Sequence, residues 1–271
     1  MSDNKYLSGK YALITGSSRG IGRGTAIKLA ERGAKVAVNY IQDEAAANHT
    51  LNEIRKAGSD GFIIQADVSD PAQVDAMMKA VKKNFGSLDI LVSNAIGKFL
   101  EKLIPPLQVN LSQFEDAIRE HSRAYLNCVQ QAAGIMNDGG RIIVISYRPG
   151  SHGGGFLPYF CAGTNKAAEE AMSRYFAVAL APRRITVNTV SAGITEDSVM
   201  NALPSEAQNA MRDWLQQGWN PHKKIGSTAE VGGAVAALCS DDAGWITGQT
   251  ITADGGASLM NPEVPLFFQQ P

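Results

Sequence analysis

Several features that would place this chain in a special class are scarce or missing. Its 271 residues include three cysteines and only 7% aromatic residues, and the formal net charge is -1. A charge this close to zero argues against nucleic acid and anionic membranes as partners, because both attract strongly basic surfaces. No stretch approaches the ~18 apolar residues that a membrane span requires. We therefore expect neither a membrane protein nor a nucleic-acid-binding protein.

The cysteines are too few and too scattered to indicate a metal site or a disulfide framework. Cys128, Cys161 and Cys239 lie far apart, and none belongs to a CxxC pair. This pattern favours packed thiols in a reducing compartment and no bound metal. The segment 1–10 is polar and lacks the apolar stretch of a secretory signal. We therefore expect a cytoplasmic protein.

Apolar residues make up 44% of the chain and follow an alternation of strands and helices. Seven short runs are rich in Val, Ile and Leu, which is typical of strands buried on both faces of a parallel sheet. The runs are Tyr11–Thr15, Lys35–Tyr40, Phe62–Ala66, Ile90–Ser93, Arg141–Ile145, Ile185–Val190 and Gln249–Ala253. Helical patterns separate them. The sequence thus predicts an α/β fold, a single-domain, Rossmann-like, doubly wound parallel sheet with helices on both faces.

One region, at about residues 192–226, interrupts this alternation with a long excursion before the last strand. Ser205–Gln208 has the pattern of a capping box that opens a helix. An apolar stripe follows, formed by Ala207, Met211, Trp214 and Leu215. This helix packs on the core, serves as a mobile substrate lid, or does both, since such folds bind ligands at the carboxyl ends of their strands.

A glycine-rich segment joins the first predicted strand to the first predicted helix. Residues Thr15–Gly22 read TGSSRGIG, a TGxxxGxG spacing. Glycines at such a turn let the backbone approach a pyrophosphate, whose charge the helix N-terminus then stabilises. Its place in a βαβ unit makes a dinucleotide site the favoured interpretation. The cofactor contacts expected in this loop are Gly16, Ser18, Arg19, Gly20, Ile21 and Gly22.

The TGxxxGxG spacing resembles that of the short-chain dehydrogenase/reductase family, and the resemblance covers essentially the whole chain. Asp67–Val68 follows the third strand, where the family places an adenine contact. Asn94–Ala95 follows the fourth strand, and Asp254–Gly256 closes the last one. The resemblance implies further cofactor contacts, which are Asp67, Val68, Asn94, Ala95 and, after the sixth strand, Gly193.

The choice of nicotinamide depends on the end of the second strand. An acidic residue there would bond the ribose hydroxyls of NAD and repel the 2′-phosphate of NADP. Here the strand ends with Val38, Asn39 and Tyr40, and the next acid is Asp43. Arg19, inside the glycine loop, can pair with a 2′-phosphate. The sequence therefore predicts NADPH rather than NADH as the cofactor, with Asn39 among the binding residues.

The residues expected to carry the chemistry depart from the family's usual pattern. Family members carry Ser at the end of the fifth strand, then Tyr and Lys separated by three residues. Lys166 begins a helical stretch here as the family lysine does, but Ala162 stands four positions before it and Tyr159 seven. Seven residues make about two helical turns, so Tyr159 and Lys166 can share a face about 10 Å apart along the axis. A merely structural role for both is the alternative.

The fifth strand supplies a second departure. It ends with Ser146 and Tyr147, and by register with the family Tyr147 takes the position of the catalytic Ser. Ser146 is not a simple substitute, because neighbours on a strand face opposite ways. Tyr147 is either a second phenol at the site or a core aromatic. His121 stands near where many relatives place a helix Asn that organises a water chain, and it is either a core or solvated residue or part of a proton relay.

These departures, with Ser191–Gly193 in place of the usual Pro-Gly, resemble the NADPH-preferring enoyl-acyl-carrier-protein reductases that keep an ordinary glycine motif. The resemblance implies hydride transfer from NADPH to the β-carbon of a trans-2-enoyl thioester on acyl carrier protein, with Tyr159, Lys166 and Tyr147 as catalytic residues. Lys166 would also hold the nicotinamide ribose. The first alternative is a carbonyl or 3-oxoacyl-acyl-carrier-protein reductase of the same fold, and the second is a non-catalytic NADP-binding protein.

Assembly is the last expectation. Relatives are commonly tetramers, so the resemblance implies a homo-oligomer, either a tetramer or a dimer. The segment 264–268 is apolar. Such a segment indicates a docked tail or a subunit contact.

Overall fold

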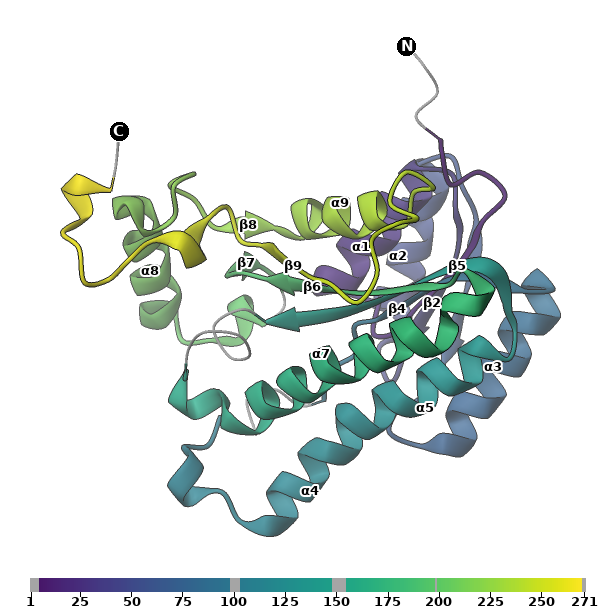
Figure 1. Ribbon diagram of the computed structural model, residues 1–271, viewed down its shortest axis with the longest axis horizontal. Coiled ribbons are helices and arrows are strands. Elements are labelled where there is room, and N and C mark those ends of the chain that lie inside the picture. Colours follow the sequence, from purple (N-terminus) through teal and green to yellow (C-terminus); the bar gives the residue numbers. More distant parts are fainter. Residues whose placement is uncertain (1–4, 98–102, 148–154, 198, 270–271) are drawn as a thin grey trace.

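The computed structural model describes residues 5–97, 103–147, 155–197 and 199–269. Within them, seven parallel strands form one sheet in the order β3-β2-β1-β4-β5-β6-β9 (Figure 1). The strands are β1 (Tyr11–Ile14), β2 (Lys35–Tyr40), β3 (Gly61–Gln65), β4 (Leu88–Ser93), β5 (Met136–Tyr147), β6 (Thr186–Ala192) and β9 (Thr250–Ala253). The predicted doubly wound parallel sheet is confirmed.

Helices cover both faces of this sheet. On one face lie α1, α2 and α9, and on the other α3, α5 and α7 with α4 beside them (Figure 1). Their bounds are α1 (Gly20–Glu31), α2 (Glu44–Lys56), α3 (Pro71–Phe85), α4 (Leu111–Glu120), α5 (Ser122–Ala133), α7 (Phe160–Leu180) and α9 (Thr228–Leu238). Neighbouring residues of a strand supply opposite cores: Ile14 packs with the α1 and α9 layer, and Leu13 packs with the α3 and α5 layer.

The predicted strands match the observed ones to within two residues at nearly every end. The exception is β5, which begins at Met136, five residues before the predicted Arg141. Met136 pairs with Leu88, and the register shifts between Leu88 and Ile90. The sequence analysis missed this extension because residues 137–140 are not apolar. A strand end that pairs on one side only needs no continuous apolar run.

The strand order places the site. From β1 the strands are added in one direction, to β2 and β3, and from β4 they are added in the other direction. Because β1 pairs with both β2 and β4, this switch point lies between β1 and β4. In open α/β sheets, ligands bind outside the carboxyl ends of the strands at such a switch point. The loop after β1 and the residues after β4 meet there.

The excursion at residues 192–226 contains a small parallel pair, β7 (Thr195–Glu196) and β8 (Gly226–Ser227), and the helix α8 (Ser205–Trp214). Ser198 lies outside the described residues. The predicted capping box is wrong. Pro204 occupies the N-cap in extended backbone, which leaves Ser205 inside the first turn, where its side chain cannot cap the helix. Reciprocal capping boxes instead open α4 and α9.

Little of α8 is buried. Of the predicted apolar stripe only Leu215, just after the helix, is buried, and Trp214 is 46% exposed and stacks on Trp219. α8 itself therefore does not pack on the core, and only Leu215, the residue that follows it, does. Near it, the C-terminal segment stands at the edge of the molecule (Figure 1). Its Phe267 and Phe268 are exposed rather than docked on the described part of their own chain.

All three cysteines are buried and free, as predicted. Among the described residues, no cluster of His, Cys, Asp or Glu has the composition of a metal site. None of the described helices is long and apolar enough to cross a membrane.

Candidate active site

The glycine loop leaves β1 and enters α1 through a turn that requires glycine. Gly16 has a φ of 63°, and a Cβ on it would lie 2.9 Å from the Cα of Ala95. A Cβ on Gly22 would lie 2.5 Å from the carbonyl oxygen of Gly16. Neither site can take a side chain without moving backbone. The loop therefore lies directly against the segment that follows β4.

Two side chains hold the outer part of this loop. Arg23 donates through Nη2 to the carbonyl oxygen of Ser18 at 2.6 Å, and the hydroxyl of Thr50 donates to the same oxygen at 3.0 Å. Arg19 precedes α1 as its N-cap residue, and its side chain is exposed. Its neighbour Ile21 sits in the first turn of α1 and packs against the core. The only charged side chains at this turn are basic.

Asn39 points into the fold. Its side chain is buried, its Oδ1 accepts from the backbone N–H of Gly16 at 2.9 Å, and its Nδ2 donates to the carbonyl oxygen of Ala66 at 3.0 Å. Both ends of the amide are engaged, so Asn39 positions the glycine loop, and its predicted contact with the cofactor stays a prediction.

Asn94 and Ala95 support the loop from β4. The Nδ2 of Asn94 donates to the carbonyl oxygens of Thr15 and Gly16, both at 3.0 Å. The backbone N–H groups of Asn94 and Ala95 donate to the hydroxyl of Thr15 at 2.9 and 3.0 Å. A buried Thr15 hydroxyl thus joins the two segments that the resemblance placed beside the cofactor.

The remaining residues predicted to contact the cofactor also lie just after the ends of strands. The carboxylate of Asp67, after β3, accepts from the backbone N–H of Ser69 at 2.8 Å, and Val68 is buried beside it. Gly193, after β6, donates its N–H to the carbonyl oxygen of Ala253 at 3.1 Å. All of the predicted cofactor residues except Lys166 therefore lie at or just beyond the carboxyl ends of strands, or in the first turn of α1.

These residues fit a dinucleotide. The first turn of α1 contains no acidic residue, and within the described chain no side chain caps it. Its backbone N–H groups are therefore available to a phosphate, which the partial positive charge of the helix terminus favours. The Gly16–Gly22 contact leaves room for backbone only, which is the arrangement that a closely approaching pyrophosphate needs.

The two predicted phenols come together. Tyr147 ends β5, and Tyr159 lies in a short 3-10 turn before α7; their ring centroids are 5.0 Å apart and the planes meet at 69°. Burial, and secondarily the charge of Asp197, raises the pKa of Tyr147 to about 12. Burial also raises the pKa of Tyr159, with smaller contributions from Tyr147, Glu169 and Asp197. Both phenols therefore keep their protons at neutral pH.

Ser146 faces away from this pair. Its hydroxyl donates to Oε1 of Glu170 at 2.5 Å, and both residues are buried. The sequence argument that strand alternation prevents Ser146 from replacing the missing serine agrees with this placement. The position next to Tyr159 is filled by an aromatic phenol instead of a short hydroxyl.

Lys166 is buried in the second turn of α7. That helix begins at Phe160, six residues before Lys166, and not at Lys166 as predicted. Pro158, in the 3-10 turn, starts the helical path early. The Nζ of Lys166 donates to Oε2 of Glu169 at 2.8 Å. His121, between α4 and α5, is buried on the same side, with its Nδ1 4.0 Å from Oε1 of Glu169.

Sequence reasoning missed three acidic residues at this site. Glu169 and Glu170 were visible only as part of a helical stretch, although Lys166 and Glu169 have the i, i+3 spacing of a helical ion pair. Asp197 sits in the excursion, where its carboxylate accepts from the N–H groups of Val199 and Met200. Burial raises the pKa of Asp197. No local signal connected it to the two tyrosines.

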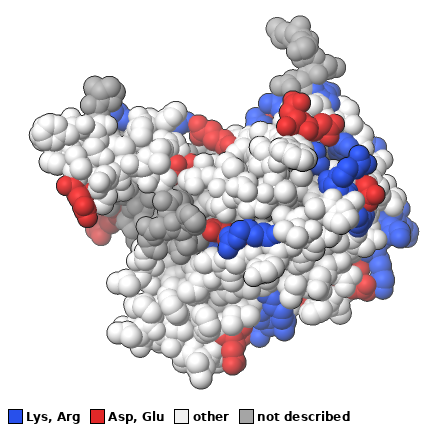
Figure 2. Space-filling model, viewed as in Figure 1, with Lys and Arg blue, Asp and Glu red and all other residues white. Residues whose placement is uncertain are grey.

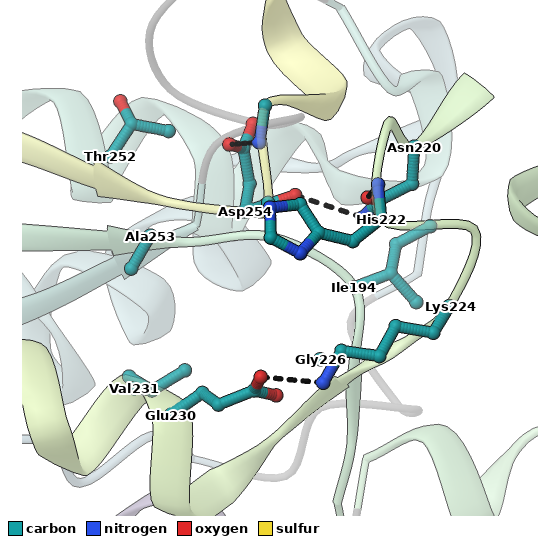
Figure 3. Close-up of a pocket in the computed structure, with 12 residues that line it drawn as sticks. Ile194, Asn220, His222, Lys224, Gly226, Glu230, Val231, Thr252, Ala253 and Asp254 are labelled. Atoms are coloured by element: carbon teal, nitrogen blue, oxygen red, sulfur yellow. Dashed lines mark hydrogen bonds and ion pairs between the residues drawn. The ribbon is translucent and has the colours of Figure 1, made fainter. Parts of the chain in front are cut away.

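A cavity of about 250 Å³ lies beside the excursion, between β9 and the start of α9 (Figure 3). Polar groups that line the cavity bond to one another: Lys224 pairs with Glu230, and Asn220 donates to the backbone of Asp254. Ile194, directly after Gly193, lines it. This cavity borders the loop after β6 and lies apart from the two tyrosines.

Fold and site together define a short-chain dehydrogenase/reductase. A family model described as Enoyl-(Acyl carrier protein) reductase matches residues 16–258. Among curated relatives, 1-cyclohexenylcarbonyl-CoA reductase of Streptomyces collinus is 36% identical over 259 residues, which cover 94% of this chain and 89% of that protein. The 3-oxoacyl-(acyl-carrier-protein) reductase FabG of Staphylococcus aureus is 38% identical over 249 residues, with 91% and 97% covered.

A solved structure extends the likeness to three dimensions. The angucycline C-6 ketoreductase LanV with bound NADP is 33% identical, with a TM-score of 0.84, and the match covers 94% of this chain and 98% of that one. The chain therefore belongs to the short-chain dehydrogenase/reductase family and is a nicotinamide-dependent reductase.

Proposed function

We propose that this protein is an NADPH-dependent enoyl-thioester reductase, which reduces the 2,3 double bond of an acyl group carried on acyl carrier protein. The observation that carries the proposal is the Tyr147–Tyr159 pair, with ring centroids 5.0 Å apart, together with the Ser146 hydroxyl turned to Glu170. In an enoyl thioester, the oxygen that gains negative charge lies farther from the nicotinamide than the oxygen of a reacting ketone does. The two phenols can both donate hydrogen bonds to an oxygen at that greater distance.

The residues of the glycine loop and of the strand ends would hold NADPH. Support comes from the relative LanV, whose structure contains NADP, and from the exposed Arg19 at the N-terminus of α1. A guanidinium can pair with the 2′-phosphate in a bidentate manner. The last residues of β2 itself are not acidic, and the nearby carboxylate of Glu44 is hydrogen-bonded to Tyr40. When bound, the nicotinamide supplies the hydride.

The chain's own residues would stabilise the charge that develops on the substrate. Tyr159 keeps its proton because burial raises its pKa, so it can donate a hydrogen bond to the thioester oxygen as negative charge accumulates there. Tyr147 would assist from the end of β5. Lys166, by the family resemblance, would hold the nicotinamide ribose.

The surface around the site suits an acyl chain. Charged side chains of both signs are interspersed over much of the visible face, but few lie where α7 begins (Figure 2). Leu157 at that end is 64% exposed, and Trp214 on α8 is 46% exposed. We propose that residues 192–226 act as a lid that covers the acyl chain, within a single domain of residues 1–271.

Reduction of a 3-oxoacyl thioester is the second candidate, and the names of FabG and LanV favour it over enoyl reduction. FabG is named for that reaction, and LanV is named as a ketoreductase. Tyr159 would then protonate an alkoxide. The name of the Streptomyces relative describes a CoA thioester conjugated with a ring double bond, which supports the enoyl candidate instead.

A homo-oligomer remains part of the proposal. Exposed apolar side chains lie on α7, where Tyr175 and Val178 are 80% and 78% exposed, and in the tail at Phe267 and Phe268. Patches of this kind are typical of contacts between subunits. Light scattering of the purified chain, with and without residues 264–271, would test it.

The deciding experiment offers the purified protein crotonyl and acetoacetyl thioesters of acyl carrier protein with NADPH or NADH, and identifies the products by mass spectrometry. We expect a saturated acyl product from crotonyl thioester and little 3-hydroxyacyl product from acetoacetyl thioester. Preferential reduction of the 3-oxo substrate would establish the second candidate. Turnover of either substrate would exclude the non-catalytic NADP-binding alternative.

A further inference from the structure

A carboxylate stands close to both phenols of the candidate active site. Ala192, the last residue of β6, is the register partner of Tyr147 at the end of β5. Asp197 follows a short way along the chain, directly after β7. Its charge raises the pKa values of Tyr147 and Tyr159, and a charge has this effect from close by. The end of β5, the turn before α7 and the excursion therefore bring three ionisable groups together.

The backbone of the excursion holds this carboxylate in one orientation. Oδ1 of Asp197 accepts from the N–H groups of Val199 and Met200, both at 2.9 Å. Met200 is 3% exposed, so the turn is fixed to the interior. Within the part of the chain that the structure describes, no hydrogen bond reaches the other oxygen, Oδ2. That oxygen can carry a proton and donate it to a bound molecule.

The surroundings of Asp197 favour its protonated form. Burial raises its pKa; the N–H groups of Met200 and Val199 act against this, and the charge of Glu196 adds to it. The titratable groups that face it are thus Glu196 on β7 and the two phenols, while Arg212 of α8 is engaged by Glu196 at 2.8 and 2.9 Å. A carboxyl group whose pKa is moved toward the working pH is suited to general acid catalysis. Its side chain is partly exposed, so water can restore its proton.

Reduction of an enoyl thioester requires an acid that acts on carbon. Once the β-carbon has been reduced, negative charge is shared between the thioester oxygen and the α-carbon. The phenols stabilise the charge on the oxygen by donating hydrogen bonds to it. The α-carbon must still take up a proton, and a phenol that bonds the oxygen is not placed to supply it.

We propose that Asp197 is a catalytic residue, the acid that protonates the α-carbon of the reduced substrate. The proposal rests on the enoyl reduction proposed above. The Oδ2–H bond breaks as the electron pair of the enolate double bond forms a C–H bond at the α-carbon. The thioester carbonyl is restored, and Asp197 is left as a carboxylate. Water then returns one proton to it, so each turnover consumes one proton, and this step oxidises and reduces no group.

The test removes the acid and keeps the turn. Asp197→Asn and Asp197→Ser both retain an oxygen that can accept from the N–H groups of the following residues, because Asn and Ser cap such turns as Asp does. Using both covers a failure of either one to fold. Glu196→Gln is the matched control, since it removes the neighbouring carboxylate, which bonds Arg212 instead.

The configuration of the α-carbon is the main readout. The protein reduces the crotonyl thioester of acyl carrier protein with NADPH in D2O, and NMR of the released butyrate, as an ester of a chiral alcohol, shows which face received deuterium. We expect one configuration from the unmutated chain and from Glu196→Gln, because a fixed donor serves one face. Both Asp197 variants should give a mixture, because water then supplies the deuteron, and kcat should fall about tenfold.

The pH dependence of turnover supplies a second readout. A general acid must carry its proton, so kcat of the unmutated chain should fall about tenfold per pH unit above the pKa of Asp197. In Asp197→Asn this descending limb should be absent. In Glu196→Gln it should move to lower pH, because the loss of a neighbouring negative charge lowers the pKa of Asp197.

A third measurement needs no turnover. Carbon-13 NMR follows the carboxyl signal of Asp197 with NADP+ present, and the signal is assigned by its loss in Asp197→Asn. Addition of the butyryl thioester of acyl carrier protein should raise the titration midpoint by at least about half a unit, because an acyl group beside a carboxylate displaces water and disfavours the charged form.

A single α-carbon configuration in a folded Asp197 variant would overturn the assignment, and so would a midpoint that butyryl thioester does not move. If crotonyl thioester is not reduced at all, the proposed function fails, while the midpoint still decides whether Asp197 lies against the acyl group.

Discussion

The cofactor end of the site and its chemical end are built from different kinds of interaction. At the cofactor end, the groups that hold the backbone around Gly16 are neutral, namely Thr15, Asn39 and Asn94. The charged Arg23, which bonds the outer part of the loop, is only partly buried. At the chemical end, Lys166 and Glu169 are buried as charges. Neutral hydrogen bonds fix a backbone shape at little desolvation cost, whereas burying two charges costs several kcal/mol per ion before their attraction offsets it.

The two ends also differ in how they match the family pattern. The glycine loop keeps the family's ordinary spacing, and its geometry depends on backbone contacts that tolerate few substitutions. Tyr147 and Tyr159 lie on segments where the pattern differs from the usual one. Binding of the cofactor and choice of the reaction are therefore separable, and mutations can affect either one alone.

The largest effect is expected from Tyr159→Phe at the chemical end. It removes only the donor, so kcat should fall at least ~100-fold while the Kd for NADPH changes less than about twofold. Steady-state kinetics and fluorescence titration measure both. Tyr175→Phe, on the exposed side of α7, is the control and should leave both values unchanged. Full turnover by Tyr159→Phe would transfer the donor role to Tyr147.

Gly22→Ala should produce the next largest effect, at the cofactor end. The added methyl would lie 2.5 Å from both the Gly16 carbonyl oxygen and Asn94 Nδ2, so the loop must move and NADPH binding should weaken on the order of 10- to 100-fold. Gly233→Ala is a matched control, because a Cβ there meets nothing within 4 Å. It should leave binding unchanged and stabilise α9 by about 0.5–1 kcal/mol. Equal affinity in both variants would contradict the backbone account.

Arg19→Ala tests, at the cofactor end, whether Arg19 selects NADPH over NADH. Loss of the guanidinium should weaken NADPH binding by on the order of 1–3 kcal/mol and leave NADH binding nearly unchanged, because only NADPH carries the 2′-phosphate. Arg55→Ala, which removes an exposed ion pair with Asp60, serves as the control. Titration of each variant with both cofactors measures this, and an equal loss for the two would argue against a 2′-phosphate contact.

The smallest effect concerns the cap of α9, which packs on α1. Glu230 and Ser227 form a reciprocal capping box, so Glu230→Gln should destabilise folding by about 1 kcal/mol or less in thermal unfolding. The Lys224 ammonium and the Ser227 backbone lower the pKa of Glu230 to about 2. Because the folded pKa is depressed, the difference from the unmutated chain should be complete above pH ~4.5 and shrink as the pH falls toward ~2. A difference that grows on acidification would contradict this sign.

Much of the fold could be predicted because strands buried on both faces appear in the sequence as continuous apolar runs. β2 was predicted at its observed bounds, Lys35–Tyr40, since all but its first residue are buried. The start of α8 was predicted from a local pattern, but Pro204 took the cap position and Ser205 lost it. Such details depend on a competition between neighbouring residues that a consensus pattern does not resolve.

Within the site, the sequence by itself determined the glycine loop, the strand ends, and the departures at Tyr147 and Tyr159, because these depend on spacing along one segment. Only the tertiary structure decided that the Ser146 hydroxyl turns to Glu170, 24 residues away. It also decided that Asn39 supports Gly16 from the next strand, and that His121 faces Glu169. These are contacts between distant segments, and their geometry follows from helix docking and strand register, which no local pattern of residues specifies.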